Sequence, residues 1–170
     1  DRSGCLRHNE STLTSLVSDP HVSVVLLVAR FEFYHRSPNR AALEPGLVRA
    51  AQALHTAGKR VVLLDPIPTY AYPVPSALAQ LVWRGQDPVE FGQTLGQYEE
   101  MQRETLEMLA RVAKRTSAKR VVSAEALCPA GRCLVVDANG LAFYFDDNHL
   151  SMQGARQLAP FILRAVDLPQ

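Results

Sequence analysis

The residues best suited to chemistry lie near the C-terminus, in the segment YFDDNHLSMQGA at positions 144–155. Asp146, Asp147 and His149 fall within four positions of this segment. A histidine can accept a proton from a serine hydroxyl near neutral pH, but it needs a carboxylate to fix its tautomer and stabilise the imidazolium. An aspartate three residues earlier can fold back to do this. The same residues would also suit a solvated loop that caps the last helix, with Ser151 as its N-cap.

Alternating strands and helices are expected around this segment. The apolar runs VSVVLLVA and RVVLL have the composition of strands that are buried on both faces. Periodic apolar residues and turn signals indicate the other elements. We expect strands at 22–29, 60–64, 119–122 and 141–145, helices at 10–19, 43–57, 76–83, 98–115 and 154–166, and irregular chain at 30–40 and 65–75.

This order predicts an α/β fold with a mostly parallel sheet in three αβα layers. A length of 170 residues favours one domain over 1–170. The loop that carries Asp146 and His149 follows an expected strand and precedes a helix. Open α/β sheets place their active sites in such loops. The position of the loop therefore favours a catalytic role.

The bulk composition is that of a globular protein, with 47% hydrophobic and 21% charged residues. The formal net charge of +1 gives no general attraction to nucleic acid. No apolar run approaches the roughly 20 residues of a membrane-spanning helix. The chain opens with Asp-Arg-Ser-Gly-Cys rather than with a start methionine and a signal peptide. We therefore expect it to begin inside a longer protein, with no nucleic-acid partner and no cofactor.

Two of the three cysteines, Cys128 and Cys133, enclose a Pro/Gly turn. They could form a disulfide, remain free thiols or supply half of a metal site. A tetrahedral zinc site needs four ligands, and neither a second cysteine pair nor a suitably spaced histidine pair is present. We therefore favour the disulfide, which implies an oxidising compartment. Cys5 would then be a free thiol or have a partner outside this sequence.

Aromatic residues flank the proline-rich segment at 65–75. Tyr70 and Tyr72 lie within it, and Trp83 follows it. Their rings could stack on sugar faces or pack the loop down, and we favour packing.

The loop resembles the last sequence block of the SGNH (GDSL-like) hydrolases, Asp-x-x-His shortly before a C-terminal helix. It is similar to the SGNH domains fused to membrane-bound acyltransferases that O-acetylate bacterial surface polysaccharides. The turn between Cys128 and Cys133 and the run VVLLVARFEFY at 24–34 also resemble that subgroup. The extended motif Asp-Asp-x-His-Leu-Ser-x-x-Gly-Ala is matched by Asp146, Asp147, His149, Leu150, Ser151, Gly154 and Ala155.

The resemblance implies a flavodoxin-like fold, His149 as general base and Asp146 as the residue that orients it. Asp147 would be a neighbour rather than the orienter. Arg30 stands where ordinary members carry Gly-x-Asn-Asp, whose asparagine is an oxyanion donor. Its guanidinium could supply donors instead, or it could form a structural salt bridge. His35 lies beyond the first expected strand, on the expected active-site side, and is a candidate substrate contact.

One family block has no counterpart here. The Gly-Asp-Ser that carries the nucleophilic serine does not occur in the 170 residues. We therefore expect the first strands of the fold to lie upstream of Asp1, and the chain alone to be an incomplete enzyme. The base would serve a serine outside this chain. An unpaired Cys5 independently suggests missing upstream sequence.

The resemblance implies O-acyl (acetyl) transfer onto a cell-envelope glycan such as lipopolysaccharide. The partners would be a glycan acceptor, an acyl donor and an integral-membrane acyltransferase domain in the same parent chain. The expected location is the periplasmic or extracellular side of a bacterial membrane, tethered to it. The alternatives are a carbohydrate or lipid esterase and, in another class, a catalytically silent module that binds glycan or docks on a membrane partner.

Overall fold

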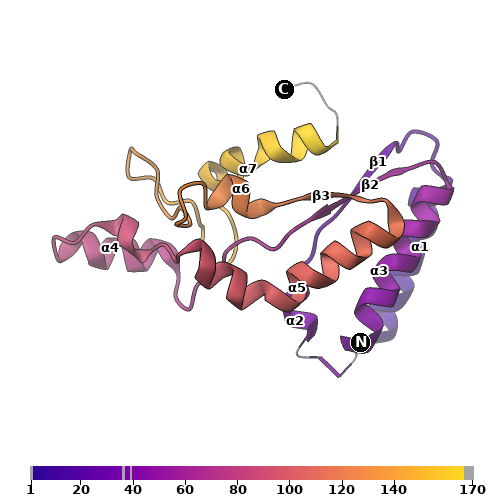
Figure 1. The fold of residues 1–170 in the computed structure, drawn as a ribbon, viewed down its shortest axis with the longest axis horizontal. Helices are drawn as coiled ribbons and strands as arrows, with labels where there is room; N and C mark the ends of the chain where they lie inside the picture. The colour runs from indigo at the N-terminus through magenta and orange to yellow at the C-terminus, as the bar shows by residue number, and fades with distance from the viewer. Residues whose placement is uncertain (1, 36, 39, 167–170) are drawn as a thin grey trace. The chain divides into compact units, whose positions relative to one another are not determined.

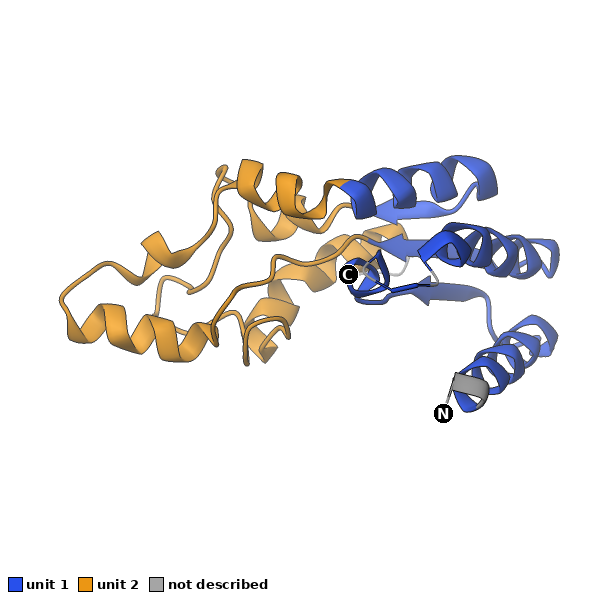
Figure 2. Ribbon diagram, turned by 90° about the horizontal axis from the view of Figure 1, so that it is seen from below, with its two compact units in different colours: residues 1–64, 104–121 blue, residues 65–103, 122–170 orange. Residues whose placement is uncertain are grey.

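The computed structural model describes residues 2–35, 37–38 and 40–166 and has a mixed α/β fold (Figure 1). The chain divides into two compact units (Figure 2). Unit 1 comprises residues 1–64 and 104–121, and unit 2 comprises residues 65–103 and 122–170. The elements are α1 (Arg2–Ser18), β1 (Val24–Leu27), α2 (Phe31–His35), α3 (Arg40–Thr56), β2 (Arg60–Leu64), α4 (Val74–Trp83), η1 (Pro88–Phe91), α5 (Leu95–Thr116), β3 (Lys119–Val121), α6 (Ser123–Leu127) and α7 (Met152–Ala165).

Unit 1 contains a parallel sheet with the strand order β1-β2-β3 among the described residues. Val25 pairs with Val61, and Leu63 pairs with Arg120. The central strand β2 has near-continuous apolar sequence because side chains on both of its faces are buried. The sheet confirms the predicted α/β class.

The core of unit 1 lies on one face of this sheet. Val61 and Leu63 point to that face because successive strand residues alternate between faces. Leu54 of α3 and Leu109 of α5 pack into the same cluster and are fully buried. Apolar residues of α1, such as Leu16, pack at its margin. These helices follow the 3.6-residue spacing that the sequence predicted for two of them.

Unit 2 is built mostly from short helices and irregular chain. Its core includes Val74, Leu78, Val135, Phe143 and Tyr144, with others from the same segments. The segments at 134–136 and 142–144 contact each other through single backbone hydrogen bonds, such as Phe143 N–H to the Val135 carbonyl at 2.8 Å. This irregular chain, rather than a sheet, supports the loop at 146–149.

The strand predicted at 141–145 is therefore wrong. The structure has isolated bridges there, pairing Val136 with Ala142 and Tyr144 with Leu150. The chain turns sharply on both sides of this segment. Before it, Asp137 Oδ1 accepts the Leu141 N–H at 2.8 Å, and after it the chain reverses between Tyr144 and Leu150. The two reversals leave too little chain for a ladder.

Other boundaries differ less. The segment at 30–40, predicted to be irregular, contains the short helix α2, whose Phe31 is buried in the unit 1 core. Helix α1 starts earlier than expected, and β1 is shorter than 22–29. Within α5, Met101 is exposed, whereas Met108 and Val112 are buried.

Candidate active site

The loop that carries Asp146 and His149 is a tight reversal in unit 2. The Phe145 N–H donates to the His149 carbonyl at 2.8 Å, and Tyr144 bridges to Leu150. These contacts close a short turn with residues 146–148 at its tip. The turn follows buried Tyr144 and precedes helix α7, so both of its ends are fixed by packed chain.

Within the turn, the Asp146 carboxylate contacts its own loop at three points. Its Oδ1 accepts the N–H groups of Asn148 and His149 at 2.8 and 2.7 Å, and its Oδ2 lies 2.7 Å from Nδ1 of His149. The expected hydrogen bond between the two side chains is therefore present. With Nδ1 donating to the carboxylate, the neutral imidazole presents Nε2 as a proton acceptor. This is the geometry that a general base requires.

The same contacts keep Asp146 ionised. The backbone N–H of Asn148 is the largest influence, followed by the His149 side chain and backbone N–H, and together they lower the pKa of Asp146 to about 2. Hydrogen bonds donated to a carboxylate favour its charged form. Asp146 is therefore an anion at neutral pH and can stabilise an imidazolium at His149.

The imidazole lies open at the surface. The His149 side chain is 73% exposed and that of Asp146 is 33% exposed. The place of this loop after an apolar segment predicts an imidazole that faces a cleft, but an exposed fraction of this size describes an open position instead. Phe145, which pairs with His149 across the turn, is also exposed. The described residues thus leave Nε2 accessible to a second group.

Helix α7 begins directly after the turn and holds it in place. Ser151 is its N-cap: Oγ accepts the Gln153 and Gly154 N–H groups at 3.2 and 3.3 Å. The same Oγ donates to the Ala142 carbonyl at 2.6 Å. The cap predicted at Ser151 is confirmed, and it supports the Asp146–His149 pair rather than replacing it.

A second support comes from the proline-rich segment, which the sequence did not connect to this loop. The Tyr70 N–H donates to the Asp147 carbonyl at 2.9 Å, and the Val74 N–H donates to the Asp146 carbonyl at 3.0 Å. Four of the eleven residues at 65–75 are prolines, which supply no N–H, so Tyr70 and Val74 are among the seven residues that can make such bonds. The sequence signal for this role was the position of each residue between two prolines.

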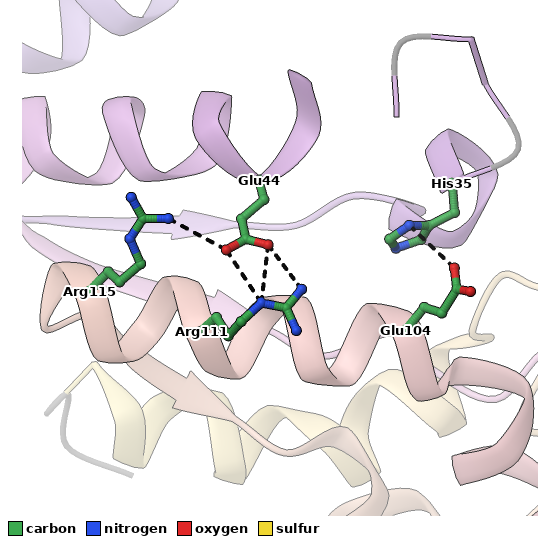
Figure 3. A network of polar contacts seen from close by, with 5 residues as sticks. All are labelled: His35, Glu44, Glu104, Arg111 and Arg115. Atoms are coloured by element: carbon green, nitrogen blue, oxygen red, sulfur yellow. Dashed lines mark hydrogen bonds and ion pairs between the residues drawn. The ribbon is translucent and has the colours of Figure 1, made fainter. Parts of the chain in front are cut away.

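Arg30 and His35 belong to unit 1, whereas Asp146 and His149 belong to unit 2. Arg30 precedes α2, is 53% exposed and donates from Nε to Glu32 Oε1 at 2.9 Å. His35 ends α2, is 20% exposed, and its Nδ1 lies 3.8 Å from Glu104 Oε2 (Figure 3). Both roles, oxyanion donor and substrate contact, remain predictions.

An ion-pair network lies beside His35 (Figure 3). Glu44 of α3 accepts from Arg111 and Arg115 of α5, at 2.9 and 3.5 Å. The hydrogen bond from Arg111 is the main reason that the pKa of Glu44 is lowered. These contacts join two helices of unit 1, and the pairing of every carboxylate oxygen of Glu44 argues for a structural role.

Cys128 and Cys133 form the predicted disulfide, and Cys5 is a free, exposed thiol. Cys133 also donates its N–H to the Gln93 carbonyl at 2.8 Å. This hydrogen bond ties the disulfide-closed turn after α6 to the chain just before α5.

In the part of the chain that the structure describes, no cluster of three or more His, Cys, Asp or Glu side chains could hold a metal ion. No helix in the same residues has the length and apolarity needed to cross a membrane.

An α/β fold that carries an Asp-x-x-His loop is typical of SGNH-type enzymes that act on acyl esters. Comparison with known proteins identifies the family. Residues 1–164 match the family model for SGNH domains fused to AT3 domains, so the chain belongs to this family. No curated protein matches the chain.

Among the solved structures that match the chain, two illustrate the shared fold. The periplasmic domain of a lipopolysaccharide acetyltransferase from Salmonella ser. Paratyphi A is 15% identical with a TM-score of 0.68, and the match covers 94% of this chain and 62% of that one. A protein from Slackia heliotrinireducens, proposed to be an SGNH hydrolase, is 18% identical with a TM-score of 0.57, and the match covers 94% of this chain and 73% of that one. The chain thus spans less than two thirds of the Salmonella domain.

Proposed function

We propose that this chain is part of an extracytoplasmic SGNH domain that transfers an acyl group, most simply acetyl, onto a cell-envelope glycan. The single observation that carries this proposal is the hydrogen bond between Asp146 and His149, within the sequence block where the family places its base. Membership of the family fused to AT3 domains supports transfer in the context of a membrane acyltransferase.

In the proposed reaction, a serine outside this chain attacks the carbonyl carbon of the acyl donor. His149 Nε2 accepts the serine proton, and Asp146 stabilises the imidazolium through Nδ1. His149 then returns the proton to the leaving group as the acyl-serine forms. A glycan hydroxyl attacks the acyl-serine, its proton passes to His149, and the serine is regenerated with that proton.

Arg30 is the proposed donor to the oxyanion that forms in both steps. A guanidinium has five N–H donors and a permanent charge, and Arg30 directs Nε to Glu32. Its other nitrogens have no partner among the described residues, so they are available to an oxygen. An Arg30→Lys variant would keep the charge and lose the planar fork, and it should lower kcat more than it raises KM. If the ion pair between Arg30 and Glu32 were purely structural, the substitution would mainly change the free energy of unfolding.

The proposed location is the periplasmic or outer side of a bacterial membrane, with the domain tethered through its parent chain. The disulfide between Cys128 and Cys133 supports this, because disulfides persist in oxidising compartments. The partners proposed are the AT3 membrane domain, an acyl donor and the glycan acceptor. The Salmonella relative, a periplasmic domain of a lipopolysaccharide acetyltransferase, supports lipopolysaccharide as one acceptor to test.

An esterase is the second candidate, and the exposure of His149 favours it. An imidazole that is 73% exposed can activate water as readily as a sugar hydroxyl. The deciding experiment supplies the parent protein in membranes with lipopolysaccharide and scores acetate on the glycan by NMR against free acetate in solution. Transferase activity predicts glycan acetylation that is lost in Asp146→Asn. Free acetate alone would identify an esterase, and neither product would favour a silent binding module.

A further inference from the structure

Unit 2 contains an open groove of about 940 Å3 whose residues have no part in the proposed chemistry. This volume lies near the top of the roughly 300–1,000 Å3 range of small-molecule sites, and it far exceeds what an acetyl group needs. The groove runs beside the start of α5, and the residues that matter here are Tyr70, Phe91, Gln97, Glu100 and Arg132.

The apolar part of the groove is aromatic. The rings of Tyr70 and Phe91 are stacked, with centroids 5.3 Å apart and planes 24° apart, and Tyr144 meets Tyr70 edge-on at 5.1 Å. Burial raises the pKa of Tyr70 to about 12, so its ring is neutral. A fixed aromatic surface of this kind suits the C–H face of a sugar ring.

The polar part of the groove offers both donors and acceptors. Arg132 supplies a guanidinium, Gln97 an amide and Glu100 a carboxylate, and all three side chains are exposed. Glu90 is also at the groove, and Glu100 forms an ion pair with Arg103 of α5. Two carboxylates therefore stand against the guanidinium groups of Arg132 and Arg103, so the groove has no net positive charge to attract an anion such as phosphate. It suits a neutral ligand with many hydroxyls, since hydroxyls both donate and accept.

The wall that carries Arg132 is held by covalent and backbone contacts. Thr94 bridges to Arg132, and Arg132 Nη1 donates to the Gly92 carbonyl. A Cβ on Gly92 would lie 2.2 Å from the Cys133 carbonyl oxygen, so the two segments touch. The disulfide at Cys133 fixes the far end of this wall. Preorganised walls reduce the cost of ordering a site when a ligand binds.

Tyr70 connects the groove to the candidate active site within unit 2. Its ring lines the groove, while its N–H donates to the Asp147 carbonyl at 2.9 Å. We propose that the groove binds a neutral sugar residue of the acceptor glycan, adjacent to the residue that receives the acyl group. This inference rests on the proposed function for the choice of glycan. It would give the domain acceptor specificity that the exposed Asp146–His149 pair alone does not supply.

The test measures binding without catalysis. The 170-residue chain is applied to a printed array of bacterial O-antigen and capsular oligosaccharides, and the strongest binder is titrated by saturation-transfer NMR. Arg132→Lys and Glu100→Gln should each weaken binding about tenfold, because each loses hydrogen bonds to a charged group. Phe91→Leu should weaken it by removing the stacked ring. Arg156→Lys and Glu125→Gln, exposed in the same unit and outside the groove, are the matched controls.

His149→Ala separates the two proposals, since it should abolish acyl transfer while leaving binding unchanged. Failure of transfer in every form would therefore overturn the proposed function and leave the groove testable. The groove proposal is overturned if no oligosaccharide binds, if binding is equal in the groove variants and the controls, or if inorganic phosphate displaces the ligand.

Discussion

A Cβ atom on Gly154 would lie 2.2 Å from the carbonyl oxygen of Phe143, so helix α7 meets the chain before the Asp146 loop at a distance that only glycine permits. This contact gives a physical reason for the glycine in the family motif. Any larger residue must move either the helix or the segment that leads into the loop.

The Gly154→Ala variant should therefore lose about 1–3 kcal/mol of unfolding free energy through overpacking. Gly46→Ala is the control, since it lies within α3 with no neighbour nearer than 4.0 Å and should be neutral or stabilising by up to about 1 kcal/mol. Urea unfolding followed by circular dichroism measures both. Equal stability of the two variants would show that the close approach is relaxed at little cost.

Ser151 gives a second test of the support beneath the site. Ser151→Ala removes the N-cap of α7 and should cost about 1 kcal/mol, within the usual range for a lost cap. Ser151→Thr keeps a hydroxyl and should retain most of the stability. Thermal unfolding distinguishes the pair, and a fall of similar size in both would mean that packing rather than capping holds this position.

The charge state of Asp146 can be followed directly by NMR titration of its carboxyl carbon. The midpoint should lie near pH 2, against 3.8 for an unperturbed aspartate. His149→Ala should raise the midpoint only partly, because the Asn148 N–H is the largest cause of the shift. An unperturbed midpoint for Asp146 in the unmutated chain would contradict the hydrogen bonds to its carboxylate.

The lowered pKa of Asp146 also makes the stability of the fold depend on pH. Because the folded-state pKa lies below the unfolded value, ionised Asp146 stabilises the fold fully at a pH above the unfolded value and loses this contribution as the pH falls toward 2. Asp146→Asn should remove that segment of the acid dependence. Urea unfolding midpoints of the unmutated chain and of Asp146→Asn are measured from pH 6 to pH 2, a range chosen to span the folded and unfolded pKa values of Asp146. They show whether the stabilities of the two proteins converge in acid.

Reduction of the disulfide between Cys128 and Cys133 should lower the free energy of unfolding by about 2 kcal/mol in the chain-entropy model. Alkylation without reductant should label Cys5 alone, and alkylation after unfolding with reductant should label all three thiols. Mass spectrometry reads both results. Labelling of three thiols in the untreated, unfolded protein would show that the bond does not form.

Several of these features could be predicted from sequence because local patterns specify them. The strand at 60–64 is a continuous apolar run between polar residues, and the structure has it with the same bounds. The α/β class follows from the alternation of such runs with amphipathic segments. The pairing of Asp146 with His149 follows from a spacing of three residues, which one turn of chain can close.

The rest depends on contacts between distant segments. LAFYF at 141–145 has strand composition, yet Phe143 bonds to Val135 on one side and to Ser151 on the other as single contacts. No local pattern reveals that the chain reverses on both sides. Likewise, the bond from Tyr70 to Asp147 joins residues 77 positions apart, and the groove beside α5 is assembled from three segments of the chain. Long-range assembly of this kind leaves no periodic signal.

The central claim is that His149, oriented by Asp146, is the base for a serine outside this chain. The most direct measurement is the rate of acetyl-ester hydrolysis by the 170-residue chain and by a form extended upstream through a Gly-Asp-Ser segment, each with and without His149→Ala. The account predicts little activity in the short form, activity in the extended form, and a loss of about a thousandfold or more on His149→Ala, because such residues act as a unit. Full activity in the short form that survives His149→Ala would contradict it.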